Sequence, residues 1–342
     1  MTEPITDRNV RVGVFGAGGW ANRSHIPNLL KLNGVEIVAV CDMDERARRS
    51  TVERWGIARA YADGHDMLNA EDLDVLYSCV PAFARTNVEV AAAEQGIHLF
   101  SEKPQAIRMS VARAIDEAIR SAGVFSTVCF RERYRPIFQE ARRLLADKKV
   151  VHARFTSIRS FPAFPPPGEE HSWRYQEDKA GGPAFDWGCH AVDYTRFMTG
   201  LNITDAQAFY CHCPEYVKAL SSSFNFRLSN GGTMTMTFVC SLQGGSAGHR
   251  EPPFSIFYEG GRLDLYTYDR IELDGAVVFR GEEFDPWLEQ DRIFIEAVRS
   301  GDDSPILNDY HDGLFSLAPV LAGWESSRRN GERIEVNTFM RA

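Results

Sequence analysis

Short apolar runs alternate with helical patterns over the first 130 residues of the chain. The apolar runs predict strands at residues 10–15, 35–41, 75–80, 97–100 and 124–130. Helical patterns lie between them, at residues 20–32, 46–55, 85–95 and 104–122, and the last is expected to begin at Pro104. Several strands are almost continuously apolar, which is typical of a parallel sheet that is buried on both faces. The pattern therefore predicts an α/β domain with a doubly wound parallel sheet over residues 1–130.

Beyond residue 150 the pattern changes to longer strands that are joined by turns. Asn230-Gly231-Gly232 separates the apolar alternation at 222–228 from that at 233–239, which indicates a hairpin. Helical patterns lie at residues 134–147, 186–198, 288–300 and 310–329, and we expect the last to pack back on the first domain. Residues 131–342 are therefore predicted to form an α+β domain with a large, mainly antiparallel sheet.

Composition and charge limit the classes of protein to which the chain can belong. The chain has 342 residues, of which 44% are hydrophobic and 25% are charged, as in ordinary globular proteins. Its net charge of −9 argues against a nucleic-acid-binding surface, which is usually basic. No apolar run reaches the about 18 residues of a membrane span, and the N-terminal residues lack a secretory pattern. We therefore expect a cytoplasmic protein.

The cysteines do not predict a disulfide framework or a metal site. Their number, seven, is odd, and most lie inside apolar runs, which is typical of reduced and buried thiols. Cys211-His212-Cys213 alternates along an expected strand, and no second Cys or His pair stands at a metal-binding spacing. We expect no metal.

A glycine-rich motif follows the first expected strand and opens the first helix. Gly16, Gly18 and Ala21 match G-x-G-x-x-A, in which the glycines permit a tight turn and a close approach to a diphosphate. Asp42 ends the second strand, where an acid can accept hydrogen bonds from ribose hydroxyls. The motif predicts a dinucleotide-binding Rossmann domain, and Asp42 favours NAD, although nearby arginines leave NADP open. The candidate cofactor-binding residues of this region are Gly16, Gly18, Gly19, Trp20, Ala21 and Asp42.

A second motif lies in the later half of the chain. Asp186, His190 and Asp193 stand at spacings of four and three, behind Gly181-Gly182. In a helix these three side chains share one face, and the carboxylate of Asp186 can orient the imidazole of His190 and increase its basicity. The alternative is a helix N-terminus with a buried core histidine.

Three motifs together resemble the Gfo/Idh/MocA family of sugar and cyclitol oxidoreductases. The glycine motif continues into Arg23-Ser24-His25-Ile26-Pro27-Asn28-Leu29, and Glu102-Lys103-Pro104 matches the family's E-K-P. Residues 181–193 resemble its G-G-G-x-L-x-D-x-G-x-H-x-x-D, which Asp186, Gly188, His190 and Asp193 match, while Pro183 departs from the glycine run. Residues 130–136, Trp173-Arg174 and the ending 326–336 are similar as well. Two departures stand after Pro81, where Ala82 and Arg85 replace the family's Asn and His.

The resemblance implies roles for individual residues. Lys103, Asp186 and His190 occupy its catalytic positions. Further residues are expected to line the cofactor, namely Cys79, Val80, Pro81, Glu102, Lys103 and Arg131. The candidate substrate-binding residues are Lys103, Tyr134, Trp173, Arg174, Asp186, His190 and Asp193, and Asp193 is equally compatible with a structural role.

The implied reaction is hydride transfer between a secondary hydroxyl of a sugar, cyclitol or glycoside and NAD(P). A histidine, with an ordinary pKa of about 6.5, can act as the base, and the lysine can stabilise the alkoxide. Two alternatives stay open: a redox-neutral glycosidase or lyase that oxidises its substrate transiently, and a ligand sensor without activity. The resemblance also implies a homodimer or homotetramer.

Overall fold

The computed structural model describes residues 4–160, 172–173, 176–180, 184–213, 219–242 and 251–342. The chain forms two compact units, Met1–Tyr134 with Asp285–Leu314, and Arg135–Phe284 with Phe315–Ala342. The sequence placed one boundary at residue 130 and assigned all that follows to a second domain. Asp285–Leu314 groups instead with the first unit, because Phe294, Ile295 and Val298 enter the same hydrophobic core as the first strand.

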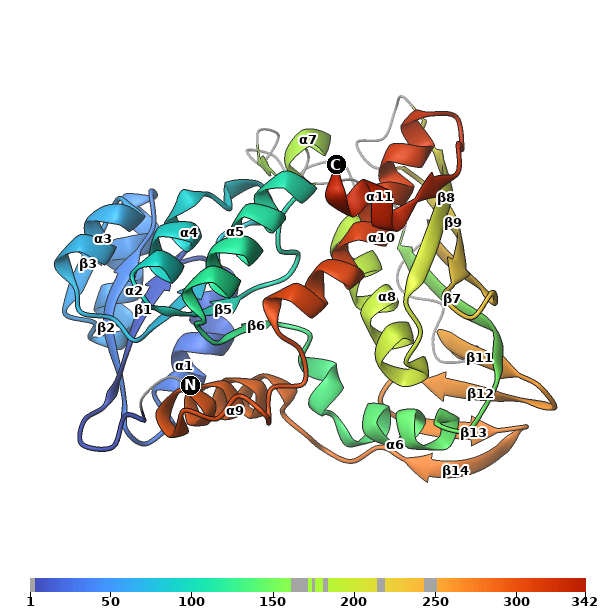
Figure 1. Ribbon diagram of the computed structural model, residues 1–342, viewed down its shortest axis with the longest axis horizontal. Coiled ribbons are helices and arrows are strands. Elements are labelled where there is room, and N and C mark those ends of the chain that lie inside the picture. Colours follow the sequence, from blue (N-terminus) through green and yellow to red (C-terminus); the bar gives the residue numbers. More distant parts are fainter. Residues whose placement is uncertain (1–3, 161–171, 174–175, 181–183, 214–218, 243–250) are drawn as a thin grey trace. The chain divides into compact units, whose positions relative to one another are not determined.

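The first unit contains a six-stranded parallel sheet in the order β3-β2-β1-β4-β5-β6 (Figure 1). Its strands are β1 (Val10–Phe15), β2 (Val35–Cys41), β3 (Arg59–Tyr61), β4 (Val75–Ser78), β5 (His98–Ser101) and β6 (Ser126–Val128). The predicted parallel sheet is confirmed, and β1 and β2 have the expected bounds. The short β3 was not predicted, because it has three residues and only one apolar side chain that is partly buried.

Helices surround this sheet. They are the π-helical turn η1 (Ala21–His25), α1 (Ile26–Leu29), α2 (Glu45–Trp55), α3 (Gly64–Ala70), the 3-10 turns η2 (Ala82–Ala84) and η3 (Arg131–Tyr134), α4 (Asn87–Glu94), α5 (Met109–Ala122) and α9 (Pro286–Ser300). Polar caps fix several starts: Asp44 and Asp285 accept backbone N–H groups at α2 and α9. The expected start of α5 at Pro104 is wrong, since the helix begins at Met109.

The second unit contains a nine-stranded sheet in the order β14-β13-β12-β11-β7-β10-β9-β8-β15. Its strands are β7 (Val150–Ser160), β8 (Ile203–Cys211), β9 (Ser221–Leu228), β10 (Thr233–Leu242), β11 (Phe254–Tyr258), β12 (Gly261–Tyr266), β13 (Arg270–Leu273), β14 (Ala276–Arg280) and β15 (Ile334–Glu335). The predicted hairpin joins β9 to β10. Among the described strands of this sheet, only β7 and β10 pair in parallel, so the prediction of a mainly antiparallel sheet is confirmed.

Helices cover one face of this sheet. Along β9, Ser222, Phe224, Phe226 and Leu228 are buried, and the residues between them are partly or fully exposed. The helices of the second unit are α6 (Pro136–Leu145), α7 (Glu177–Ala180), α8 (Phe185–Thr199), α10 (Tyr310–Arg328), whose first turn belongs to the first unit, and α11 (Val336–Arg341). The strand alternation therefore gives one apolar face and one polar face.

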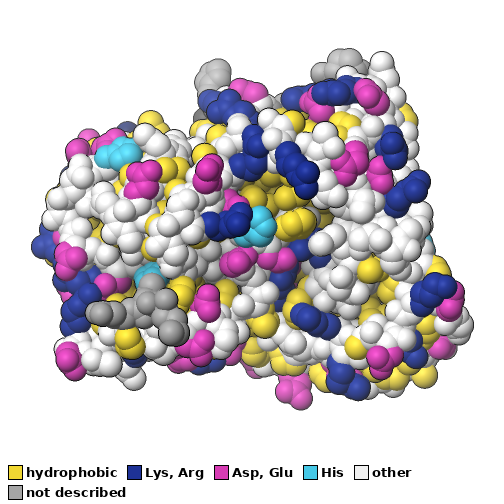
Figure 2. All heavy atoms as spheres, in the orientation of Figure 1, with side chains coloured by type: hydrophobic (Ala, Val, Ile, Leu, Met, Phe, Trp, Pro, Cys, Tyr) yellow, Lys and Arg dark blue, Asp and Glu magenta, His cyan; other side chains and the backbone are white. Residues whose placement is uncertain are grey.

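Surface and composition features agree with a globular fold. On the face shown in Figure 2, acidic and basic side chains are interspersed on each unit. Within the described ranges, no helix is both long and apolar enough to cross a membrane. No disulfide joins the cysteines of the described chain; Cys41, Cys129 and Cys189 are buried, whereas Cys211 is exposed, so the expected burial holds for only part of the set.

Candidate functional site

The glycine motif forms a tight connection between β1 and η1. Gly16 has a φ of +101°, and a Cβ there would lie 2.8 Å from the backbone of Cys79 and Val80 at the end of β4. Only glycine therefore permits this close approach. A Cβ on Gly18 would meet no atom within 4 Å, so open space lies beside the backbone at the position where the motif predicts a diphosphate.

Asp42 lies directly after β2 and contacts the same loop. Its carboxylate accepts hydrogen bonds from the N–H groups of Ala17 (2.8 Å) and Asp44 (2.9 Å). A carboxylate has about four acceptor positions, so Asp42 retains the capacity to accept bonds from a ribose diol. The loop and the acid together fit the adenosine half of a dinucleotide.

An aromatic and cationic stack lies on the first unit beside the glycine loop. Trp20, which is 48% exposed, stacks on Trp287 of α9 at a centroid distance of 6.3 Å. The guanidinium of Arg131 lies 3.8 Å from the centre of the Trp287 ring. Two predicted cofactor residues, Trp20 and Arg131, are thus joined through Trp287. Trp287 lies in α9, which belongs to the first unit.

Glu102 and Lys103 follow β5, at the same edge of the sheet. Glu102 donates its N–H to the Ser78 carbonyl (2.9 Å), and its carboxylate accepts the backbone N–H of Lys103 (3.0 Å). Lys103, Cys79, Val80 and Pro81 are partly exposed. Because β1, β4 and β5 are neighbours, the glycine loop, the β4 end and the Glu102–Lys103 turn lie along one sheet edge.

A buried hydrogen-bonded cluster, His25 with Glu102 and Asp291, lies beneath this edge. His25 is 1% exposed, and its Nε2 lies 2.9 Å from Glu102 Oε1 while its Nδ1 lies 2.9 Å from Asp291 Oδ1. Burial alone lowers the pKa of His25, but the charges and hydrogen bonds of its partners, above all Asp291, together outweigh burial, and the pKa is raised well above 6.5. Burial raises the pKa of Glu102, whereas the hydrogen bond and charge of His25 lower it to about 2. His25 is therefore an imidazolium between two carboxylates.

Arg85 occupies the position where the family often has histidine, and it is buried. Its guanidinium donates to the carbonyls of Ser78 (2.8 Å) and Glu102 (2.6 Å), and to the Ser78 hydroxyl. Arg85 therefore joins the ends of β4 and β5, a bracing role that the sequence did not reveal.

One side-chain set within the first unit has distances compatible with a metal ion. The ligand atoms of His25, Glu102 and Cys129 lie within 4.8 Å of one another. The hydrogen bond between the His25 imidazolium and the Glu102 carboxylate accounts for the proximity of these two side chains without an ion. Burial also raises the pKa of the Cys129 thiol to about 11, which disfavours the thiolate that metals bind.

The second motif is helical, as predicted, and forms the first part of α8. Asp186 is exposed, and His190, one turn later, is 2% exposed. The Tyr194 hydroxyl lies 3.3 Å from His190 Nδ1, and the Trp187 ring lies 5.4 Å from the imidazole. Arg159 of β7 places its guanidinium 4.7 Å from the centre of the Trp187 ring, and Arg159 was not among the predicted residues.

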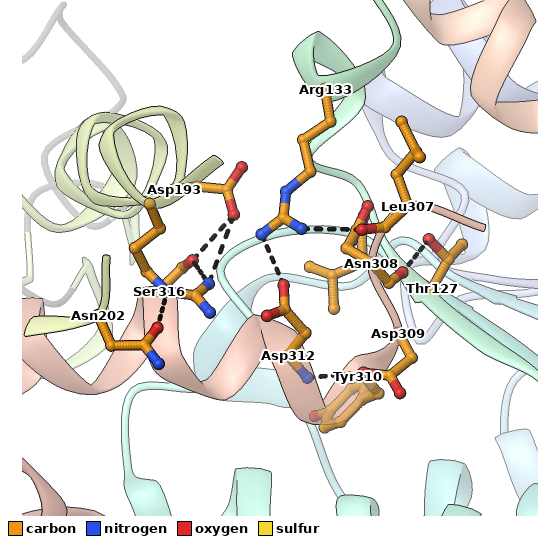
Figure 3. A network of polar contacts seen from close by, with 12 residues as sticks. Thr127, Arg133, Asp193, Asn202, Leu307, Asn308, Asp309, Tyr310, Asp312 and Ser316 are labelled. Carbon is orange, nitrogen blue, oxygen red and sulfur yellow. Dashed lines mark hydrogen bonds and ion pairs between the residues drawn. The ribbon is translucent and has the colours of Figure 1, made fainter. Parts of the chain in front are cut away.

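The remaining predicted substrate residues have internal partners or lie outside the described residues. Asp193 is fully buried and accepts a hydrogen bond from Ser316 (2.9 Å), which in turn accepts one from Arg196 (2.7 Å; Figure 3). Tyr134 is buried, and its hydroxyl accepts the N–H of Leu307 (3.0 Å). Trp173 is partly exposed, and Arg174 and the glycines at 181 and 182 lie outside the described residues.

Comparison with known proteins agrees with this arrangement. Residues 10–130 match the model "Oxidoreductase family, NAD-binding Rossmann fold", and residues 138–264 match the "GFO/IDH/MocA C-terminal domain". The chain is 28% identical to D-xylose 1-dehydrogenase (NADP(+)) 2 of Haloferax volcanii, over 95% of this chain and 99% of that protein. It is also 28% identical to D-glucoside 3-dehydrogenase of Escherichia coli, over 59% of this chain and 57% of that protein.

A solved structure shares the fold over the full length. The WlbA dehydrogenase of Bordetella pertussis, in complex with NADH and UDP-GlcNAcA, superimposes with a TM-score of 0.81 at 21% identity, covering 97% of this chain and 99% of that one. The two family models indicate the same family as the glycine loop and the E-K-P turn, which lie at one sheet edge. The chain belongs to the GFO/IDH/MocA family and is an NAD(P)-dependent oxidoreductase.

Proposed function

We propose that the protein is a dehydrogenase that transfers a hydride between a secondary hydroxyl of a sugar, cyclitol or glycoside and NAD(P), with Lys103 and His190 as catalytic residues. The observation that carries the proposal is the sheet edge of the first unit. There the Gly16–Gly18 loop and the Glu102–Lys103 turn are separated only by the end of β4. A dinucleotide that binds at the loop extends along this edge toward Lys103.

Each catalytic residue has a distinct task. The bound nicotinamide supplies the hydride acceptor or donor. Lys103, as a cation, stabilises the negative charge that develops on the substrate oxygen. His190 takes the hydroxyl proton; the Tyr194 hydroxyl contacts its Nδ1 and fixes the plane of the ring, and Asp186 lies one turn away on the same helix.

The cofactor preference follows from Asp42. Its carboxylate stands at the end of β2, where it accepts hydrogen bonds from ribose hydroxyls and repels a 2′-phosphate. We therefore infer that NAD is bound more tightly than NADP.

The substrate class is supported by the names of the relatives, which act on a D-glucoside and on D-xylose. Carbohydrates present several adjacent secondary hydroxyls. The partly exposed Trp187 and Trp173 and the exposed Arg159 of the second unit are side chains that stack on sugar rings or donate to their oxygens.

The proposal is tested by assaying pyranoses, pentoses, inositols and glycosides for reduction of NAD and NADP by the wild type. Lys103→Met and His190→Ala are then compared with two matched controls, Lys31→Met on the surface of the first unit and His152→Ala in β7. We expect both site variants to lose turnover while NADH binding persists, and both controls to keep it. Retained turnover in Lys103→Met and His190→Ala would refute the assignment, and substrate conversion without NADH accumulation would indicate a redox-neutral elimination instead.

A further inference from the structure

The cluster of His25, Glu102 and Asp291 is not used by the proposed chemistry. All three residues are at most 6% exposed. Burial of charged groups costs several kcal/mol per ion before their mutual attraction is counted, so hydrocarbon of similar volume is often as stable or more stable. The presence of three ionisable groups under the sheet edge therefore points to a role other than stability.

The cluster connects three segments that are distant in sequence. His25 ends the π-helical turn η1 that follows the glycine loop, Glu102 follows β5, and Asp291 lies in α9. Asn28 donates to the second carboxylate oxygen of Asp291 (3.0 Å), so Asp291 is itself held in place. π-helical turns occur frequently at functional sites, because they reorient one side chain without ending the helix.

Glu102 is held from two sides. Its carboxylate is held by the His25 ring, and its carbonyl is held by the Arg85 guanidinium (2.6 Å). The backbone N–H of Lys103 donates to the same carboxylate, at 3.0 Å from Oε2. Both polar groups of the Glu102–Lys103 peptide, its C=O and its N–H, are therefore hydrogen-bonded to buried charged groups.

We propose that His25 is a positioning residue for Lys103: held by Asp291, its ring fixes the Glu102 carboxylate and through it the backbone that carries the lysine. This inference rests on the proposed function, in which Lys103 acts on the substrate hydroxyl. It assigns no contact between His25 and the substrate.

The charges of the cluster also affect Lys103 directly. The groups that face His25 are Glu102, Asp291, Cys79, Cys129 and Tyr77. Without the imidazolium, the Glu102 carboxylate loses its main counterion, and Lys103 and Arg131 become the neighbouring cations that it attracts. The lysine side chain would then turn toward Glu102, and its pKa would rise.

The test compares His25→Ala, His25→Gln and Asp291→Asn with a matched control, His98→Ala. His98 is a buried histidine of β5 in the same sheet, and its ring accepts a hydrogen bond from the N–H of Phe125 (2.8 Å) at the end of the strand remote from Glu102. A purely structural role predicts that all variants lose stability in the same way and that the folded fraction stays fully active.

Two measurements separate positioning from stability. The first is kcat and KM, with a sugar that the wild type oxidises: misplacement by about 1 Å can cost about 100-fold, so we expect His25→Ala to lose about 10- to 100-fold in kcat. KM for NAD should stay within about threefold of wild type, and His25→Gln, which keeps an N–H donor toward Glu102, should recover part of the loss.

The second measurement is the pH dependence of Lys103 acetylation by trace acetic anhydride, read by mass spectrometry. We expect the midpoint of this pH dependence to rise by about one pH unit in His25→Ala.

The outcomes are distinguishable from a failure of the proposed function. If the wild type oxidises none of the sugars, the proposed function fails, but Lys103 acetylation still tests the positioning because it needs no substrate. If His25→Ala does not fold, Asp291→Asn leaves the ring in place and carries both measurements. An unchanged kcat together with an unchanged Lys103 titration in a folded variant overturns the inference, and so does an equal loss of kcat in His98→Ala.

Discussion

Replacing Glu102 by Gln tests the electrostatic description of the buried cluster. The substitution keeps the size of the side chain and removes its charge, so His25 retains only Asp291 as a charged partner. A buried charge pair that loses one member is strongly destabilising, because the remaining charge stays buried without its counterion.

The magnitude follows from the titration of Glu102. Its pKa falls from an ordinary value of 4.5 to about 2 on folding, and at about 1.4 kcal/mol per pKa unit this corresponds to roughly 3 kcal/mol. Because the folded pKa is the lower one, this contribution is present in full above pH 4.5 and is lost as the pH falls toward 2. We therefore expect Glu102→Gln to lower the free energy of unfolding of the first unit by roughly 3 kcal/mol at neutral pH, and by less below pH 4.5.

The assay must report on the first unit alone, since two compact units can unfold separately. Urea unfolding followed by pulsed hydrogen exchange of peptides from β1 and β5 meets this requirement. Glu36→Gln is the matched control, because Glu36 lies in β2 of the same sheet and its side chain is 49% exposed in an ion pair with Arg11. That exposed pair should contribute less than about 1 kcal/mol. A Glu102→Gln effect as small as that of Glu36→Gln, or one that does not diminish below pH 4.5, would refute the reasoning.

Two further predictions concern residues whose roles were inferred from sequence. Asp42→Ser removes the carboxylate beside the glycine loop, so KM for NAD should rise and KM for NADP should fall, each by about tenfold; unchanged values for both cofactors would mean that Asp42 does not contact the ribose. Asp193→Asn should lower stability by about 1–3 kcal/mol in thermal unfolding with little change in substrate KM, because the carboxylate is fully buried against Ser316 and Arg196. A large increase in KM at unchanged stability would instead return Asp193 to the substrate site.

Much of the fold was predictable because local patterns carry it. The apolar runs of β1 and β2 were long enough to fix both bounds, and the glycine motif located the connection after β1. The three-residue β3 escaped because two of its residues are exposed, so that it is a strand through its pairing with β2 and not through an apolar run of its own. Pro104 suggested a helix start by its residue type, but Arg108 precedes the first turn of α5, four residues later. The preference of proline for helix starts therefore predicted correctly that a helix exists here, but it predicted the wrong first residue.

The candidate site was only partly predictable, for a different reason. Glycine loops and the Glu102–Lys103 turn are local motifs, but Asp291 meets His25 across 266 residues of sequence. Gln290 and Asp291 nevertheless left a signal, since both lie on the buried face of α9 with Phe294, a position that normally carries an apolar side chain. A polar residue in an apolar stripe indicates a buried partner, although it does not identify that partner.

The same reasoning explains why Asp193 was undecided from sequence. An apolar stripe is informative only where a helix also has an exposed face, as α9 does at Glu296. In α8, both Asp193 and its neighbours Val192 and Tyr194 are buried, so no contrast between faces exists. A carboxylate there has the same sequence pattern whether it binds a substrate hydroxyl or Ser316. The two roles are distinguished by the position of Ser316, which lies 123 residues later in the chain and donates a hydrogen bond to Asp193. This hydrogen bond favours the structural role.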